Sequence, residues 1–235
     1  MSRSIVQGIV LKTIRYSDND LIIHLFTREF GRIAIMIRRS KKSGRSNYYQ
    51  PLFQLSIVVN FNEKRTIHRA SQVSFHTPYI SIPFAIRKNT VAQFLAEILG
   101  KVISEGEPDE ELYDFVSGAL LLFDRTDKNT HVFHLVFLTQ LTRFLGFFPG
   151  SDNRQQGWFS PSEGTFVPQI MHDTIPQELT SEFENLLKTP VSQYANVDIA
   201  NDFHHQLLDY IVQLYQVQLN AFNLKSYDIL KQVFA

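Results

Sequence analysis

The hydrophobic pattern of this 235-residue chain changes its period once, at residues 77–84 (TPYISIPF). Before this stretch apolar and polar residues alternate, as in IAIMIR and LSIVVNF, which is typical of half-buried β-strands. After it apolar residues recur every three or four positions, which is typical of amphipathic helices. Pro78 and Pro83 separate the two patterns. The sequence therefore predicts an α+β protein, with a β domain at residues 1–80 and an α-helical domain at residues 81–235.

Five segments of the first domain are predicted strands: 4–13, 21–27, 30–38, 51–61 and 66–75. Polar, turn-forming pieces lie between them. Five short strands suit a small antiparallel barrel or sandwich, and a five-stranded barrel of the OB type is one such solution that commonly binds oligonucleotides. The number of strands fits an SH3-like barrel equally well, so periodicity leaves both folds open.

The second domain is predicted to be a bundle of helices at 84–103, 107–124, 130–147, 201–219 and 225–234. Pro108 and the acids at 109–111 suit the first turn of a helix. Residues 149–176 interrupt the helical pattern with many Gly, Pro and Ser residues, which predicts an irregular excursion. We expect Trp158, Phe159 and Phe166 to hold this excursion against the helices.

Charge is distributed unevenly along the chain, although 23 Lys and Arg balance 23 Asp and Glu overall. Residues 1–90 contain 15 basic and 4 acidic side chains, a net charge of +11, and the remaining residues contain 8 and 19, a net charge of −11. Such asymmetry indicates a polyanionic partner for the basic half.

The densest positive charge lies in the loop MIRRSKKSGRS at residues 36–46, which contains no acid. Such a loop is either a solvated turn or a contact to a phosphate backbone, and the charge asymmetry favours the second. We expect the nucleic-acid-binding cations to be Arg15, Arg38, Arg39, Lys41, Lys42, Arg45, Lys64, Arg65 and Arg69. Tyr48 and Tyr49 follow the loop and are candidates to stack on unpaired bases.

Few residues suggest catalysis or a cofactor. The chain has no cysteine, no HExxH zinc motif, no glycine-rich phosphate loop and no GxSxG nucleophile elbow. The pairs His131/His134 and His204/His205 are expected to be ordinary helix histidines. Residues 131–148 are apolar but contain Gln140 and Arg143, which favours a buried helix over a membrane span. We therefore expect a cytoplasmic protein that is not an enzyme and binds neither cofactor, metal nor membrane.

The segment GIVLKTIRYSDNDLIIHLFTREFGRIAIMIRRSKK at residues 8–42 closely resembles the start of the bacterial recombination mediator family RecO, or recombination protein O. That family opens with G-x-V-L, a Y-x-E/D-x-D-x-I/L turn, L-F-T-x-x-x-G and then a basic run. The segment YYQPLFQLSIVV at 48–59 resembles its next strand. Weaker resemblance continues in LGFFP at 145–149, FSPSEGTF at 159–166 and LKSYDIL at 224–230.

This resemblance implies an N-terminal OB domain, a helical C-terminal domain and a role in DNA repair and recombination near the nucleoid. Such proteins bind single- and double-stranded DNA and anneal complementary strands. With RecR they help load RecA onto DNA coated by single-strand-binding protein, whose acidic, apolar C-terminal tail they contact. The candidates here for the tail are Arg125, Lys128 and Arg143, which the sequence does not rank.

The chain departs from this family in its excursion. Many members carry four zinc-binding cysteines there, whereas residues 149–176 contain one histidine, His172, and no cysteine. One imidazole does not replace four thiolates, so we expect no zinc. Two other functions stay open at this point: an RNA-binding OB protein, and a helical scaffold whose basic loop binds an acidic protein.

Overall fold

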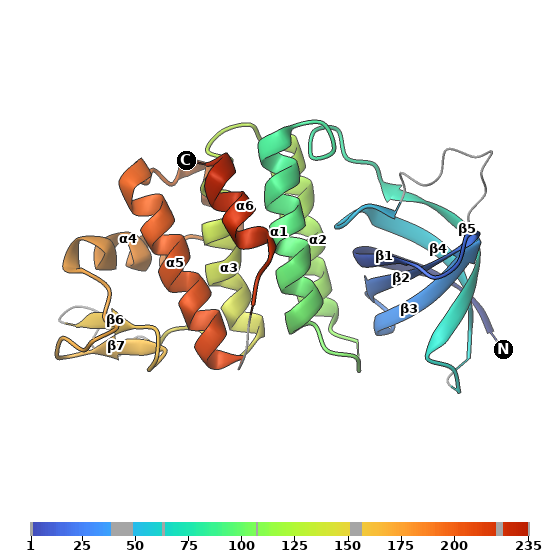
Figure 1. Cartoon of the computed structure of the whole chain (residues 1–235), viewed down its shortest axis with the longest axis horizontal. Helices are drawn as coiled ribbons and strands as arrows, with labels where there is room; N and C mark the ends of the chain where they lie inside the picture. Colours follow the sequence, from blue (N-terminus) through green and yellow to red (C-terminus); the bar gives the residue numbers. More distant parts are fainter. Residues whose placement is uncertain are drawn as a thin grey trace. The chain divides into compact units, whose positions relative to one another are not determined.

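The computed structural model describes residues 2–38, 49–62, 64–106, 108–150, 157–219 and 223–234. Its N-terminal part is a closed five-stranded barrel (Figure 1). The strands are β1 (Ser2–Arg15), β2 (Asp20–Thr27), β3 (Gly31–Arg38), β4 (Gln54–Phe61) and β5 (Ile67–Thr77). Their order around the barrel is β1-β2-β3-β5-β4.

The pairing of the strands distinguishes between the two barrels that the sequence left open. All neighbours are antiparallel except β3 and β5, which run parallel, and β4 closes the barrel against β1. This is the OB-type arrangement, so the predicted fold class is confirmed. Alternate strand residues fill the interior, including Ile23, Ile35 and Ile57, each fully buried. Gly31 has a φ of 62° and therefore allows the tight turn from β2 into β3.

Two helices pack with the barrel as one compact unit, residues 1–125: α1 (Ile86–Val102) and α2 (Glu110–Arg125). The Asp109 carboxylate accepts a hydrogen bond from the Leu112 amide at 2.9 Å and so caps the start of α2. Phe26 of β2 packs against Tyr113, with ring centroids 5.5 Å apart. The predicted domain boundary after residue 80 marks the change from strand to helix, but the packing of this unit extends to Arg125.

The second compact unit, residues 126–235, is built around α3 (Phe133–Phe144), whose side chains are buried on almost every side. Around it lie α4 (Gln177–Lys188), the short helix η2 (Val191–Asn196), α5 (Asn201–Gln218) and α6 (Ser226–Val233). The Tyr215 hydroxyl of α5 donates to the Leu138 carbonyl of α3 at 2.8 Å. Neither α4 nor η2 was among the helices predicted from the sequence.

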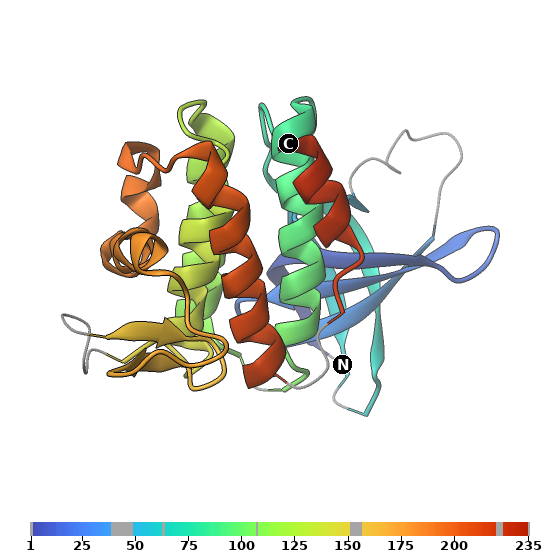
Figure 2. The same cartoon turned by 60° about the vertical axis from the view of Figure 1, so that its left-hand side comes forward.

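The excursion contains a two-stranded sheet of β6 (Trp158–Ser160) and β7 (Thr165–Val167), which lies next to α4 (Figure 2). Phe159 and Phe166 are buried with centroids 5.4 Å apart, and Phe159 also packs on Phe183 of α4 at 4.4 Å. Trp158 is half-buried. Aromatic packing thus holds this hairpin on the helices.

Candidate nucleic-acid interface

One outer face of the barrel collects cations from different strands. Residues paired across neighbouring strands point to the same side of a sheet. Ile22 of β2 pairs with Met36 of β3, and Met36 with Arg69 of β5. Their strand neighbours Ile23 and Ile35 are fully buried, so this row faces outward. Arg69 is correspondingly exposed.

Two further cations lie on the same face. Arg38 is the last residue of β3, is exposed, and pairs with Asp20 two positions along the strand from the Ile22–Met36 pair. Lys12 of β1 is exposed and pairs with His24, two positions from Ile22. Lys12 was not among the predicted contacts, although its place in an alternating strand was a usable signal. Asp20 is the one acid within the five strands.

The positive charge of this face acts on a neighbouring titratable group. Burial, followed by the charges of Arg32 and Lys12, lowers the pKa of His24. Burial disfavours the imidazolium, and nearby cations disfavour it further. His24 is therefore neutral at pH 7 and adds no charge to the face.

The turn from β1 to β2 carries Arg15, which is exposed and forms an ion pair with Asp18 at 2.8 Å. The Ser17 hydroxyl accepts bonds from the amides of Asn19 and Asp20 at 3.2 and 3.1 Å, which fixes the turn. An exposed ion pair of this kind contributes about 0–1 kcal/mol to the free energy of unfolding. A phosphate can therefore replace Asp18 as the partner of Arg15 at little cost.

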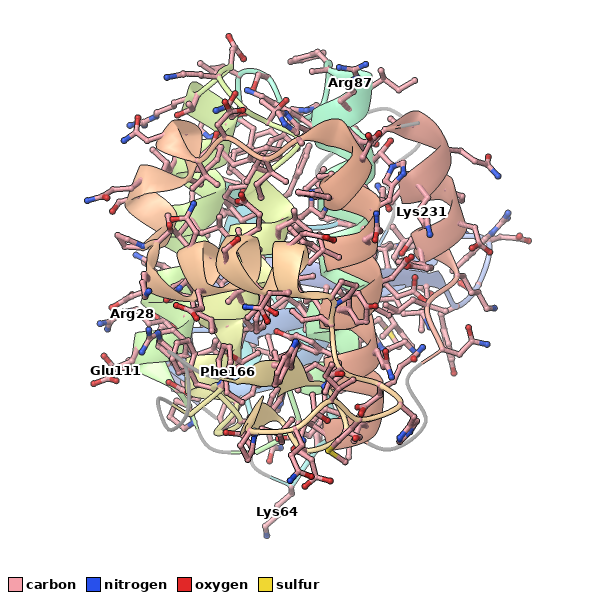
Figure 3. The ribbon with its side chains drawn as sticks, turned by 90° about the vertical axis from the view of Figure 1, so that its left-hand side faces the viewer. Arg28, Lys64, Arg87, Glu111, Phe166 and Lys231 are labelled. Carbon is pink, nitrogen blue, oxygen red and sulfur yellow. The ribbon has the colours of Figure 1, made fainter. Side chains whose placement is uncertain are left out.

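The turn from β4 to β5 presents Lys64 and Arg65, both exposed. The Asn62 side-chain oxygen accepts from the Lys64 amide at 3.0 Å, and the Asn62 carbonyl accepts from the Arg65 amide at 2.9 Å. Figure 3 shows Lys64 projecting from the molecule. These two cations and Arg69 therefore follow one another along β5 and the turn before it.

Several predicted residues lie outside the described part of the chain, and one lies in the wrong place for its predicted role. Arg39, Lys41, Lys42, Arg45 and Tyr48 belong to residues 39–48, which the structure does not describe. Tyr49 is 7% exposed, and its carbonyl accepts a bond from the Thr13 hydroxyl at 2.7 Å. The prediction that Tyr49 stacks on bases is wrong, because a buried ring offers no free face.

Other cations of this unit are committed to the fold. Arg28 forms ion pairs with Glu110 at 2.7 Å and with Asp114 at 2.9 Å on α2. The hydrogen bond from Arg28 lowers the pKa of Asp114. Arg32 donates to the carbonyls of Gly100 and Ile103 at 2.9 and 2.8 Å, at the end of α1. Neither was among the predicted DNA contacts, and both hold the helices to the barrel.

The three cations suggested for an acidic protein tail differ in their surroundings. All three are exposed; Arg125 belongs to the first unit, and Lys128 and Arg143 belong to the second. Arg143 donates to the Gln140 side chain at 2.8 Å and to the Leu187 carbonyl at 3.2 Å. Its guanidinium carbon lies 3.5 Å from the centroid of the Phe148 ring. Arg143 thus already supports the packing of α3 and α4.

The described residues form neither a metal site nor a membrane span. Among them, no group of three or more His, Cys, Asp or Glu is placed to hold a metal ion. Within the same part of the chain, every helix is too short or too polar to cross a bilayer. The excursion's Asp173 instead accepts bonds from the Ser160 hydroxyl at 2.9 Å and the Ser162 amide at 2.8 Å. Burial alone would raise the pKa of Asp173, but these hydrogen bonds lower it below its usual value.

The chain matches known families and proteins over nearly its full length. The family model described as "Recombination protein O N terminal" matches residues 1–79, and "Recombination protein O C terminal" matches residues 83–228. The chain is 31% identical over 235 residues to DNA repair protein RecO of Flavobacterium psychrophilum, covering 97% of this chain and 98% of the relative. It is 33% identical over 244 residues to DNA repair protein RecO of Porphyromonas gingivalis, with the same coverage. With its OB-type barrel, helical region and matches to both parts of the family, the chain belongs to the RecO family of DNA repair proteins.

Proposed function

We propose that this chain binds single- and double-stranded DNA through the sugar–phosphate backbone, using the outer face of the barrel and the basic loop. The observation that carries the proposal is the shared face of Lys12, Arg38 and Arg69, which come from three strands and are all exposed. Arg15, Lys64 and Arg65 extend the positive charge to two turns. Cations that neutralise phosphates release counterions, so this contact is insensitive to base sequence and sensitive to salt.

The same charge distribution supports strand annealing. Two complementary strands repel each other through their phosphates, and a cationic surface that holds both lowers this repulsion. The second unit contains 6 Lys and Arg against 11 Asp and Glu, so it disfavours DNA and leaves its helices for proteins. We propose no catalytic step, because backbone contacts alone account for binding and annealing.

Family membership supports a place for this activity in recombinational repair. We propose that the chain acts with RecR to help load RecA onto DNA coated by single-strand-binding protein. Contact with the acidic C-terminal tail of that protein would use a cation beside an apolar surface. All three are exposed, but the Arg143 guanidinium already contacts Gln140, Leu187 and Phe148, so Arg125 and Lys128 suit this role better. The three candidates can be ranked by replacing each arginine or lysine with alanine and measuring the affinity of each variant for a synthetic tail peptide.

An annealing assay tests the central part of this proposal. A variant with Arg38, Arg39, Lys41, Lys42 and Arg45 all changed to Ala should bind both forms of DNA weakly and anneal complementary oligonucleotides slowly. The control variant changes Lys101, Lys188 and Lys225 to Ala, which removes positive charge outside the proposed contact. Annealing by the five-residue variant at the wild-type rate would show that the proposed contact is wrong. Binding of RNA with equal strength but without annealing would indicate an RNA-binding protein instead.

A further inference from the structure

Three large apolar side chains are exposed to solvent in the connection from β5 to α1 and at the first residue of α1. Ile80, Phe84 and Ile86, named here the linker cluster, are 71%, 82% and 75% exposed. Figure 1 shows this connection at the top of the view, between the barrel and α1. Single exposed apolar residues are ordinary, whereas several together mark interaction sites. Three of them lie within seven residues of the sequence, which makes this connection a candidate binding surface.

The cluster is held in this exposed position by a buried polar network. The Asp124 carboxylate, 4% exposed, accepts bonds from the amides of Ile80, Ser81 and Ile82 at 2.8, 2.8 and 2.9 Å. The buried Lys88 ammonium donates to the Ser81 hydroxyl at 2.7 Å. The amide of Phe84 then donates to the Ser81 carbonyl at 2.9 Å. These bonds fix the backbone before Phe84, and α1 begins two residues after it, so a fixed backbone carries the exposed ring.

The surroundings of the cluster favour a negatively charged ligand. Arg87 directly follows Ile86 and is exposed, and exposed Arg125 directly follows Asp124. A ligand that carries both negative charge and apolar surface matches this combination.

The cluster also belongs to the same compact unit as the proposed DNA-binding face. The Tyr79 hydroxyl, next to Ile80, donates to the Leu52 carbonyl at 2.9 Å, and the Tyr79 ring lies 5.8 Å from the Phe53 ring. Leu52 and Phe53 lead from the end of the basic loop into β4. Ile80 therefore lies close to the residues that lead into β4, in the same compact unit as the barrel cations.

We propose that the linker cluster binds the unpaired bases of single-stranded DNA, with Phe84 stacked on one base. Ile80 and Ile86 contact the neighbouring nucleotides, and Arg87 and Arg125 contact their phosphates. This inference rests on the proposed DNA binding and adds a preference for single strands. Aromatic side chains beside cations are the usual platform for single strands, and bases inside a duplex are already stacked on each other.

Phe84→Ala tests this site. Affinity is measured for a thymidine oligonucleotide and for a blunt duplex of the same length, at one salt concentration. The variant should bind the single strand about tenfold more weakly, the loss of one stacked base, and the duplex as wild type does. Phe84→Trp should keep single-strand affinity, and the introduced indole fluorescence should be quenched by the oligonucleotide beyond the quenching of Trp158 in the wild type. Ile170→Ala, which changes a side chain 72% exposed in the second unit, is the matched control and should bind as wild type.

Three results would overturn the inference in different ways. If the wild type binds neither DNA, both the proposed function and this site are wrong. If the wild type binds but Phe84→Ala changes single-strand and duplex affinity equally or not at all, the proposed function stands and this site is wrong. If Phe84→Ala instead abolishes binding of an acidic tail peptide and leaves DNA binding intact, the linker cluster is a protein-docking surface. Unchanged circular dichroism of each variant shows that the chain is folded.

Discussion

Arg28 and Arg38 are both arginines next to strand ends of the barrel, yet their guanidinium groups have different partners. Arg28 is bound by Glu110 and Asp114, whereas Arg38 is exposed on the outer face opposite Asp20. The sequence around each residue does not reveal this difference, because the partners of Arg28 lie more than 80 positions away on α2. The sequence therefore shows that the first half of the chain is basic. It does not show which of its cations form ion pairs within the fold and which are exposed.

At the same scale, Asp124→Ala should destabilise the first unit strongly. The change leaves three backbone amides without their side-chain acceptor, and the Ser81 hydroxyl loses its bond to the carboxylate. We expect the free energy of unfolding to fall by about 2–4 kcal/mol, as for buried hydrogen bonds to a charged group. Chemical denaturation measures it. Asp18→Ala removes only an exposed ion pair and should cost less than about 1 kcal/mol, so equal losses in the two variants would contradict this account.

At the scale of the elements, local periodicity located the five strands and five of the helices to within a few residues. The helix α4 was missed although Leu179, Phe183 and Leu186 recur at helical spacing in QELTSEFENLLK. Its position after the irregular excursion obscured this pattern. The closure of the barrel could not be predicted from local periodicity. The parallel pairing of β3 with β5 joins residues about 33 positions apart, and no local pattern encodes that register.

The contact between α3 and α5 should make stability depend on pH. Burial lowers the pKa of His204 to about 4, partly opposed by its bond to the His131 carbonyl, and burial also lowers the pKa of His134 well below its usual value. Unfolding returns both to about 6.5, so below that pH the unfolded state binds more protons. The free energy of unfolding should therefore fall as pH falls from 6.5 towards 4, by about 1.4 kcal/mol per pH unit for each histidine.

Two variants separate the contribution of His134 to the pH dependence of the free energy of unfolding from the contributions of the other titrating groups. In His134→Met the slope between pH 6.5 and 5 should be shallower than in the wild type by about 1.4 kcal/mol per pH unit. Phe137→Leu, a buried change on the same helix, should lower stability by the same amount at each pH. An unchanged slope in His134→Met would show that this imidazole does not stay neutral in the folded protein.

At the scale of the whole molecule, the two halves of the chain differ in fold and in charge together. The barrel and most of the positive charge occur in the same residues, and the hydrophobic periodicity together with the charge distribution predicted that association. Composition did not predict that the first compact unit includes α1 and α2, because Arg28, Arg32 and Gln54 bind helix groups that are distant in sequence. Nor did composition predict the linker cluster, because Ile and Phe are residue types that are usually buried in a core.

The salt dependence of single-strand binding tests the central claim, that the basic barrel and its loop hold the DNA backbone, most directly. The logarithm of the wild-type association constant should fall linearly with the logarithm of salt concentration, with a slope of roughly −0.7 per phosphate contacted. The variant with Arg38, Arg39, Lys41, Lys42 and Arg45 changed to Ala should show weaker binding, and its slope should be shallower by roughly 0.7 for each phosphate that it no longer neutralises. Equal slopes and equal affinities in the two proteins would contradict the claim.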